Sequence, residues 1–323
     1  MPKRSLLQYL IISLKGLAMG AADIVPGVSG GTIALIAGFY EELIETIDRL
    51  DFKFFKKWRE NGFLKTWKEY NLSFLLALGL GVATSILLLA KVIENLLESH
   101  PILVWSFFFG LVLASIVYII KQLERWNAAV VLSIILASLL AFGISTLNPL
   151  AETNSVWFLF FAGFIAIIAM ILPGISGAFI LLLLGAYQPV IGLLNQLNEG
   201  IAQGNFSLLM ESIGKISVFL LGAAIGLKSF SRTLTWMFHH HKNITLAILT
   251  GFMIGALNKI WPWKEVLETR LNSKGIEVPF IEKSVLPGNF ENDPQLTSAI
   301  ICLVAGFLII FILEKSATLK NTR

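Results

Sequence analysis

Long apolar runs separated by short polar segments extend along the whole chain. A membrane-spanning helix needs about 20 apolar residues. Runs near this length predict helices at about 72–97, 101–120, 127–147, 212–237, 244–261 and 296–313. Two further apolar stretches, 9–44 and 157–191, are interrupted by proline, glycine and serine. Each predicts two short helical arms, which form either one broken span or one re-entrant hairpin. The predicted arms are 9–22 with 29–44, and 157–171 with 176–191.

The two interrupted stretches repeat one motif. IVPGVSGGTIALIAGFYEELI (Ile24–Ile44) aligns without gaps on ILPGISGAFILLLLGAYQPVI (Ile171–Ile191), and 10 of 21 positions are identical. Chance similarity between apolar helices explains shared leucine and isoleucine, but not a shared P-G-x-S-G followed by Gly and Tyr at equal spacing. Weaker similarity continues downstream, so we divide the chain into two homologous halves, 1–150 and 151–323. Such internal repeats are typical of transporters, whose substrate site lies where the repeats meet.

The distribution of lysine and arginine favours the re-entrant interpretation. If both stretches enter and leave on one face, the basic N-terminus, segment 49–68 and the basic C-terminus share the cytoplasmic side, as the positive-inside rule requires. The exception is segment 262–295, which is basic but falls outside; long translocated loops constrain orientation less. Each half then has an odd number of spans, so the second half is inverted. The sequence predicts an all-α polytopic membrane protein of two inverted repeats, each one re-entrant helical hairpin plus three transmembrane helices, with cytoplasmic termini.

The P-G-x-S-G motif at the hairpin tips predicts an anion site. Proline suits the first turn of a helix, and glycine lets a ligand approach the backbone closely. Free N–H groups and hydroxyls at a helix N-terminus attract anions such as phosphate. The structural residues of the tips are Pro26, Gly27, Pro173 and Gly174. The candidate substrate-binding residues are Ser29, Gly30, Gly31, Thr32, Ser176 and Gly177. The alternative interpretation is that these small residues only permit close helix packing.

Charged residues near the tips are further candidates. Lys15 and Arg232 are cations near span ends that could reach a phosphate, although each alone is typical of a snorkelling anchor. Asp23 has no counterpart in the second copy, where Met170 stands. A charged Asp at bilayer depth costs about 2.5–3.5 kcal/mol, so Asp23 is paired with a cation such as Lys15, lies near water, or takes up a proton and couples transport to it. A helix-capping role is the alternative. Glu41 is a second candidate for proton coupling, or a solvated helix end.

Composition supports a membrane protein and excludes other classes. The chain is 56% hydrophobic and 14% charged, whereas a soluble domain has about 25% charged residues. One cysteine excludes an intrachain disulfide. The net charge of +4 fits basic loops that fix topology, and no basic module predicts a nucleic-acid partner. No catalytic residue, cofactor or metal site is predicted, because the chain shows no nucleophile-and-base arrangement, P-loop or dinucleotide fingerprint.

The motifs also carry a resemblance to a known family. GAADIVPGVSGGTIALIAGFYEELI and ILPGISGAFILLLLGAYQPVI resemble the paired signatures of the PopT-type polyprenyl-phosphate transporters, formerly a membrane domain family of unknown function, over essentially the whole chain. The resemblance implies a flippase in the prokaryotic plasma membrane that returns undecaprenyl phosphate, or a related polyprenyl phosphate, from the outer to the cytoplasmic leaflet for recycling in cell-envelope synthesis. The second copy has Ala178 and Phe179 where the first has Gly31 and Thr32, so we expect the first tip to dominate headgroup contacts.

A flippase agrees with what the residues predict. Burying an isolated charge in a low-dielectric medium costs on the order of tens of kcal/mol, so the phosphate needs a path between the halves, while the prenyl tail stays among membrane lipids. We expect alternating access with the headgroup at the two tips. The alternative is a secondary transporter of a small soluble anion that uses the same two-hairpin site. The oligomeric state and the coupling ion are not assigned.

Overall fold

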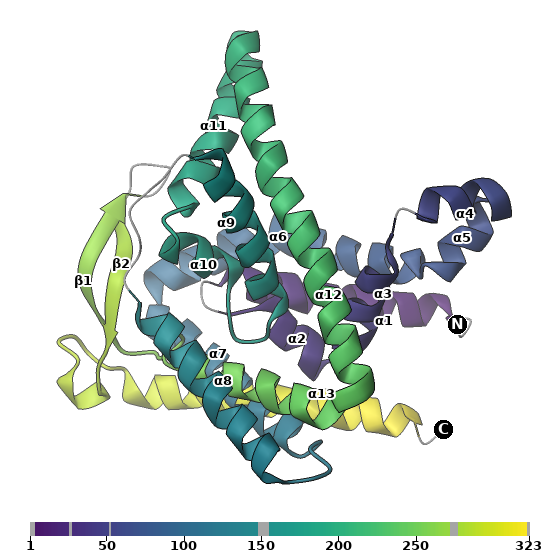
Figure 1. Ribbon diagram of the computed structural model, residues 1–323. Coiled ribbons are helices and arrows are strands. Elements are labelled where there is room, and N and C mark those ends of the chain that lie inside the picture. The colour runs from purple at the N-terminus through teal and green to yellow at the C-terminus, as the bar shows by residue number, and fades with distance from the viewer. Residues whose placement is uncertain (1–3, 26–27, 52, 148–154, 272–276, 322–323) are drawn as a thin grey trace.

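The computed structural model describes residues 4–25, 28–51, 53–147, 155–271 and 277–321, and most of them are helical (Figure 1). The helices of the first half are α1 (Leu6–Ile24), α2 (Gly30–Ile36), α3 (Tyr40–Arg49), α4 (Lys53–Asn61), α5 (Phe63–Glu69), α6 (Leu72–Ser99), α7 (Pro101–Ile120) and α8 (Ala128–Thr146). Those of the second half are α9 (Val156–Ile171), α10 (Gly177–Leu183), α11 (Tyr187–Gln203), α12 (Phe206–Ala256) and α13 (Leu296–Asn321).

Several helices are long and apolar enough to cross a membrane. Among the described residues they are α1, the Leu72–Leu89 part of α6, α7, α8 and α12, with a sixth span if the bent pair α10–α11 counts as one. The outer face of α8 is apolar: Leu132, Leu136, Leu139 and Leu140 are all more than half exposed. Such a surface is stable only against lipid or another apolar partner. The chain is therefore a helical membrane protein, as the sequence predicts.

The spans predicted at 212–237 and 244–261 are two helices that meet at a sharp kink at His241 (φ −139°, ψ 46°) and share the label α12 (Figure 1). The bounds of one other helix differ from the prediction. The first arm, predicted at 9–22, extends from Leu6 to Ile24 as α1. A serine N-cap explains its early start, because the Ser5 hydroxyl accepts the Gln8 N–H and the Gln8 side chain accepts the Ser5 N–H.

The arm after each tip is broken at a glycine. Gly38 (φ 71°) separates α2 from α3, and Gly185 (φ 69°) separates α10 from α11. Both residues adopt the left-handed conformation that favours glycine, and this conformation ends the short helix before it. The α10–α11 pair bends by 106° at its break. The sequence predicted one continuous arm at 29–44 and another at 176–191, and both predictions were wrong in this respect.

Segment 262–295 contains an antiparallel β-hairpin that the sequence analysis did not predict. Strands β1 (Lys264–Leu271) and β2 (Glu277–Ser284) pair with Lys264 opposite Ser284. Side chains alternate between the two faces of a strand, so Lys264, Glu282 and Ser284 share one face. The hairpin lies at the opposite side of Figure 1 from α3–α5, the start of α1 and the end of α13. The all-α prediction was therefore wrong for this segment.

Corresponding helices in the two halves pack through corresponding glycines. A Cβ at Gly16 of α1 would collide with the Leu78 carbonyl of α6. A Cβ at Gly163 of α9 would likewise collide with the Phe219 carbonyl of α12. Small residues allow such close backbone contact in membranes. The division into two repeats, the inversion of the second repeat and the re-entrant path of both hairpins stay predictions.

Contacts between the halves follow the same pattern. Gly110 of α7 packs on the Leu303 backbone of α13, and Gly251, at the aligned position in α12, packs on the Ile134 backbone of α8. The last helix of each half, α8 or α13, therefore packs against a helix of the other half. The two interrupted stretches also contact each other, through α2 and α9.

Candidate functional site

The two motif tips contact each other directly. Pro26 and Gly27 lie outside the described residues, so the first tip is described from Val28 onward. In the second tip, Gly174 has a left-handed φ of 86° that favours glycine. Its position is crowded as well, since a Cβ there would lie 2.9 Å from the Phe252 carbonyl oxygen of α12. The second tip therefore depends on glycine for both its turn and its packing.

Hydroxyl groups of the first hairpin bind the backbone of the second. The Ser29 hydroxyl lies 3.0 Å from the Leu172 carbonyl and 3.2 Å from the Met170 carbonyl, and the Tyr40 hydroxyl donates to the Ile171 carbonyl at 3.1 Å. Carbonyls at the end of a helix lack partners within that helix, so these hydroxyls cap α9. At most 2% of the Ser29 and Tyr40 residues is exposed.

A third cross-hairpin bond comes from Thr32. Its hydroxyl accepts the Gly174 N–H at 3.0 Å, and the residue is completely buried. Gly31 also faces the second hairpin, because a Cβ at this position would collide with the Ile171 carbonyl. The residues that the sequence singled out in the first copy therefore hold the second hairpin in place.

The N–H groups at the start of α2 are already occupied. The Asp23 carboxylate accepts the Gly30 N–H at 2.6 Å, the Ser29 hydroxyl accepts the Gly31 N–H at 3.1 Å, and the Ser29 carbonyl accepts the Thr32 N–H at 2.9 Å. The sequence predicted free N–H groups here, and this conformation has none among these residues. Asp23 acts as a capping anion at the helix start, where the sequence predicted a ligand.

Lys15 lies at the other end of α2. Its ammonium donates to the Ala37 carbonyl at 2.5 Å and sits 5.6 Å from the Phe39 ring centroid. A cation at a helix C-terminus and an anion at its N-terminus both stabilise the helix dipole. Lys15 and Asp23 therefore act at opposite ends of α2, and the Lys15 side chain is directed to the break between α2 and α3 rather than to the tip.

The polar side chain of the second tip makes fewer hydrogen bonds than those of the first. Ser176 is the N-cap residue of α10 but makes no capping hydrogen bond. It is only 7% exposed, and its hydroxyl has no partner among the described residues. Gly177 packs against the Ala166 carbonyl, 2.8 Å from where its Cβ would lie. We expected the first tip to offer more to a ligand, whereas the hydroxyl without a partner among the described residues belongs to the second.

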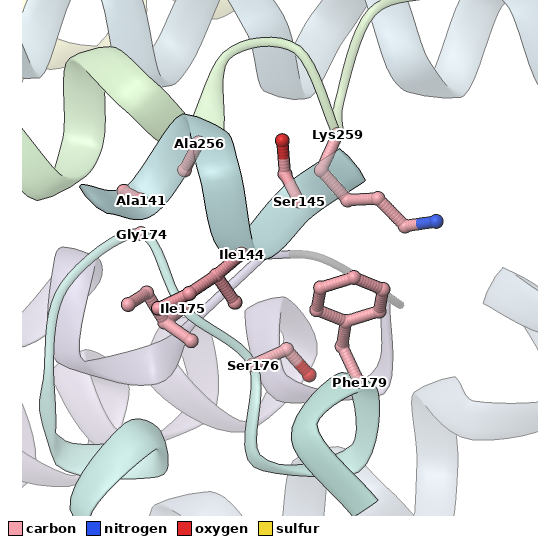
Figure 2. A pocket seen from close by; sticks show the side chains of 9 residues that line it. All are labelled: Ala141, Ile144, Ser145, Gly174, Ile175, Ser176, Phe179, Ala256 and Lys259. Atoms are coloured by element: carbon pink, nitrogen blue, oxygen red, sulfur yellow. The ribbon is translucent and has the colours of Figure 1, made fainter. Parts of the chain in front are cut away.

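A small cavity lies beside this tip (Figure 2). Ser176 and Phe179 of the second hairpin face Ser145 of α8 and Lys259, which follows α12. The cavity has a free volume of about 10 Å³, about enough for one water molecule. A larger hollow of about 360 Å³ lies next to it. Its lining residues are Phe109, Leu257, Asn258, Trp261, Ser284, Val285 and Leu286.

Two lysines share one carboxylate near this cavity, and sequence reasoning missed them. Lys259 and Lys264 lie 3.5 Å and 3.4 Å from the same Glu282 oxygen. The Lys259 ammonium also lies 4.6 Å from the Phe179 ring centroid. Only 8% of the Lys264 side chain is exposed, and this burial lowers its pKa to about 8. We expected Lys259 inside the span at 244–261 and Lys264 in a translocated loop, and β1 (KEVLETRL) shows no alternation of apolar and polar residues that could have revealed the strand.

The remaining sequence candidates lie away from the tips. Arg232 is exposed on α12 and makes no hydrogen bond or ion pair with the residues that the structure describes. Glu41 pairs with Lys242 at 3.1 Å. It belongs to a row of cross-half pairs between α3 and α12, which also joins Glu45 to His239 at 2.7 Å and Asp48 to Lys228.

Part of this row has the donor set of a metal site. Ligand atoms of Glu41, Glu45 and His239 all lie within 4.8 Å of one another. Lys242 and Arg49 already pair with the two carboxylates, at 3.1 Å and 3.0 Å. Because these cations supply the opposite charge, the cluster is balanced as a set of ion pairs. The row therefore joins α3 to α12 across the two halves.

Comparisons with known proteins agree on one family. A family model described as VCA0040-like, undecaprenyl phosphate translocase-like, matches residues 19–278. The chain is similar to a polyprenyl-phosphate transporter of Vibrio cholerae, with 44% identity over 315 residues, 96% of this chain and 98% of the relative. It is also similar to a polyprenyl-phosphate transporter of Staphylococcus aureus, with 29% identity over 261 residues, 77% of this chain and 85% of the relative. No solved structure matches.

Proposed function

The chain belongs to the VCA0040-like family of undecaprenyl phosphate translocase-like proteins, and we propose that it is a flippase for undecaprenyl phosphate or a related polyprenyl phosphate. It moves the lipid from the outer to the cytoplasmic leaflet of a prokaryotic plasma membrane and so returns the carrier for cell-envelope synthesis. Transport follows alternating access and involves no covalent chemistry. The names of both bacterial relatives support the substrate class.

One observation carries the proposal: the donors of the first tip bind oxygen atoms that a phosphate can replace. The Ser29 hydroxyl, the Tyr40 hydroxyl and the Gly30 N–H now bind backbone carbonyls of the second hairpin or the Asp23 carboxylate. Phosphate oxygens are stronger acceptors than neutral carbonyls. A headgroup that enters between the tips therefore separates the hairpins without leaving these donors unpaired.

Asp23 provides a means of coupling this exchange to protons. A phosphate that binds the Gly30 N–H takes the position of the Asp23 carboxylate. Two like charges about 4 Å apart repel by about 4 kcal/mol at an effective dielectric constant of about 20. Protonation of Asp23 removes that repulsion and weakens its hold on Gly30. A proton therefore accompanies the headgroup, and a proton gradient drives transport.

The two faces of the molecule support alternating access. Ion pairs between α3 and α12 close one face, and the 360 Å³ hollow lies beside the β-hairpin. The kink at His241 and the end of α12 at Ala256 mark these two faces. Those 15 residues of helix correspond to about 22 Å. The structure then represents a state closed toward the cytoplasm, and transport requires the α3–α12 pairs to separate.

The test is reconstitution in liposomes that contain undecaprenyl phosphate, with the accessible headgroup measured in each leaflet. We expect the purified protein to accelerate exchange between leaflets, and an inward proton gradient to shift the distribution toward the inner leaflet. Uptake of inorganic phosphate into the same liposomes is measured in parallel. Lipid exchange at the rate of protein-free liposomes, together with saturable phosphate uptake, would favour the soluble-anion alternative and contradict the proposal.

A further inference from the structure

We propose that Lys259, with Ser176 and Ser145, forms a phosphate-monoester subsite beside the β-hairpin, where a polyprenyl phosphate docks before its headgroup reaches the tips. The identity of the lipid rests on the proposed function, whereas the phosphate chemistry of the subsite follows from its own residues. Glu282 occupies the subsite in the absence of ligand and holds the Lys259 ammonium in position.

The charges of the cluster do not balance. Lys259 and Lys264 share a single oxygen of Glu282, and the exposed fractions of the three side chains are 21%, 8% and 20%. Glu265 and Lys283 are opposite each other in the hairpin and point away from the Lys264 face. Among the residues that the structure describes, one positive charge is therefore left uncompensated in a largely buried setting, which is unfavourable. A bound anion removes this imbalance.

Two serines lie near this lysine. Ser176, whose hydroxyl has no partner among the described residues, and Ser145 line the small cavity together with Lys259 (Figure 2). Ser145 accepts a hydrogen bond from the Asn258 amide at 3.3 Å and donates its own proton to the Phe142 carbonyl at 2.8 Å, so a phosphate must compete with that carbonyl for this donor. The cavity holds only about 10 Å³, so the phosphate sits at its mouth against the partly exposed ammonium.

The neighbouring hollow gives the subsite its preference for a lipid. It is lined by Phe109, Leu257, Trp261 and Leu286, and the Asn258–Ser145 hydrogen bond joins it to the small cavity. Its volume of about 360 Å³ lies within the range of about 300–1,000 Å³ for small-molecule sites. The occupant is the first prenyl units of the tail, which adjoin the phosphate.

The experiment compares Lys259→Gln with Lys283→Gln. Lys283 is an exposed lysine of the same hairpin and makes no ion pair with the described residues, so it controls for the loss of one positive charge. Binding of farnesyl phosphate, farnesol and inorganic phosphate to the full-length protein in detergent is measured by calorimetry. We expect Lys259→Gln to weaken farnesyl phosphate binding about tenfold or more, since a charge-assisted hydrogen bond is lost. Lys283→Gln should bind like the wild type.

Glu282→Gln separates an anion subsite from a structural ion pair. It removes the carboxylate that competes with a phosphate for both lysines. We expect this variant to bind farnesyl phosphate several-fold more tightly than the wild type. Affinity that is unchanged or weaker would show that Glu282 only fixes the hairpin, and unchanged affinity in Lys259→Gln would overturn the subsite.

The three probes separate the subsite from the proposed function. Tight binding of inorganic phosphate that depends on Lys259, without added affinity for farnesyl phosphate, keeps the subsite and contradicts the lipid substrate. Normal lipid exchange in liposomes with Lys259→Gln keeps the flippase and rejects the subsite. Binding of farnesol as tight as that of farnesyl phosphate rejects a phosphate subsite and leaves only an apolar groove.

Discussion

The same motif has two different environments in the two hairpins. Ser29 is buried and bonded to carbonyls of the other half, whereas Ser176 has no hydrogen-bond partner among the described residues. The substituted positions account for the difference. Thr32 accepts a backbone N–H of the second tip, while its counterpart Phe179 lies beside the Lys259 ammonium.

The charged residues near the two tips also differ. Asp23 lies beside the first tip, and its counterpart in the second copy is Met170. Lysines lie beside the second tip. A repeat therefore fixes the backbone of both hairpins, and a few unmatched residues give one tip an acid and the other a positive charge. A phosphate that passes from the second tip to the first moves from cations to a protonatable carboxylate.

The largest effect is expected for Asp23→Asn. The amide oxygen still accepts the Gly30 N–H, so the fold is retained, but the residue carries no proton. A gradient of one pH unit contributes about 1.4 kcal/mol per proton, which is about a tenfold shift in leaflet distribution. We expect this shift to disappear in liposomes that contain Asp23→Asn, with Glu60→Gln as an exposed control. If the Asp23→Asn variant still responds fully to the gradient, Asp23 does not couple transport to protons.

Gly31→Ala should produce the largest loss of stability at the tips. An added Cβ collides with the Ile171 carbonyl, and overpacking of this kind costs about 1–3 kcal/mol. The matched control is Gly79→Ala, because nothing lies within 4 Å of a Cβ at Gly79. Thermal unfolding in detergent compares the two. Equal melting temperatures would mean that the hairpins are not in close contact.

Thr32→Val and Ser176→Ala test the difference between the tips more directly. Valine preserves the shape of Thr32 but leaves the buried Gly174 N–H without its acceptor, which costs about 1–3 kcal/mol. Ser176→Ala removes a hydroxyl without a partner among the described residues, and we expect its free energy of unfolding to stay within about 0.5 kcal/mol of the wild type. A reversed order of the two variants would contradict the asymmetry described above.

The smallest effect concerns the lysine cluster and pH. Burial lowers the pKa of Lys264 to about 8, from 10.5 in an unfolded chain. Between these values the unfolded chain retains a proton that the folded protein has released, so stability rises with pH. The gain from Lys264 is about 1 kcal/mol between about pH 8 and about pH 9. The free energies of unfolding of the wild type and of Lys264→Met are measured across this pH range, and their difference isolates the contribution of Lys264. A difference that does not change with pH would mean that the Lys264 ammonium is exposed to water.

Much of the helical fold could be predicted from the sequence, because lipid imposes long apolar runs and a doubled motif marks related segments. The runs around α6, α7 and α8 gave helices close to the predicted bounds. Polar histidines and a lysine interrupt the apolar pattern near His241, and the structure has a break between two helices there, as predicted. The β-hairpin was missed because its strands, KEVLETRL and EVPFIEKS, do not alternate apolar and polar residues.

The candidate site was predictable only in part. The motif identified Ser29 and Thr32, but their partners lie more than 140 positions away in the sequence. Only tertiary packing shows that these hydroxyls bind the other hairpin. Lys259 and Glu282 were not predictable, because their proximity depends on how a β-hairpin folds back against the end of α12.

The measurement that tests the central claim most directly is leaflet exchange of undecaprenyl phosphate with Ser29→Ala, compared with Thr233→Ala. Both variants lose one hydroxyl, but among the described residues the exposed Thr233 hydroxyl binds only the Ser229 carbonyl of its own helix. If headgroup and second hairpin compete for the same donors, Ser29→Ala exchanges lipid about tenfold more slowly than the wild type, while Thr233→Ala retains the wild-type rate. Exchange by a folded Ser29→Ala protein at the wild-type rate would contradict a headgroup site at the tips.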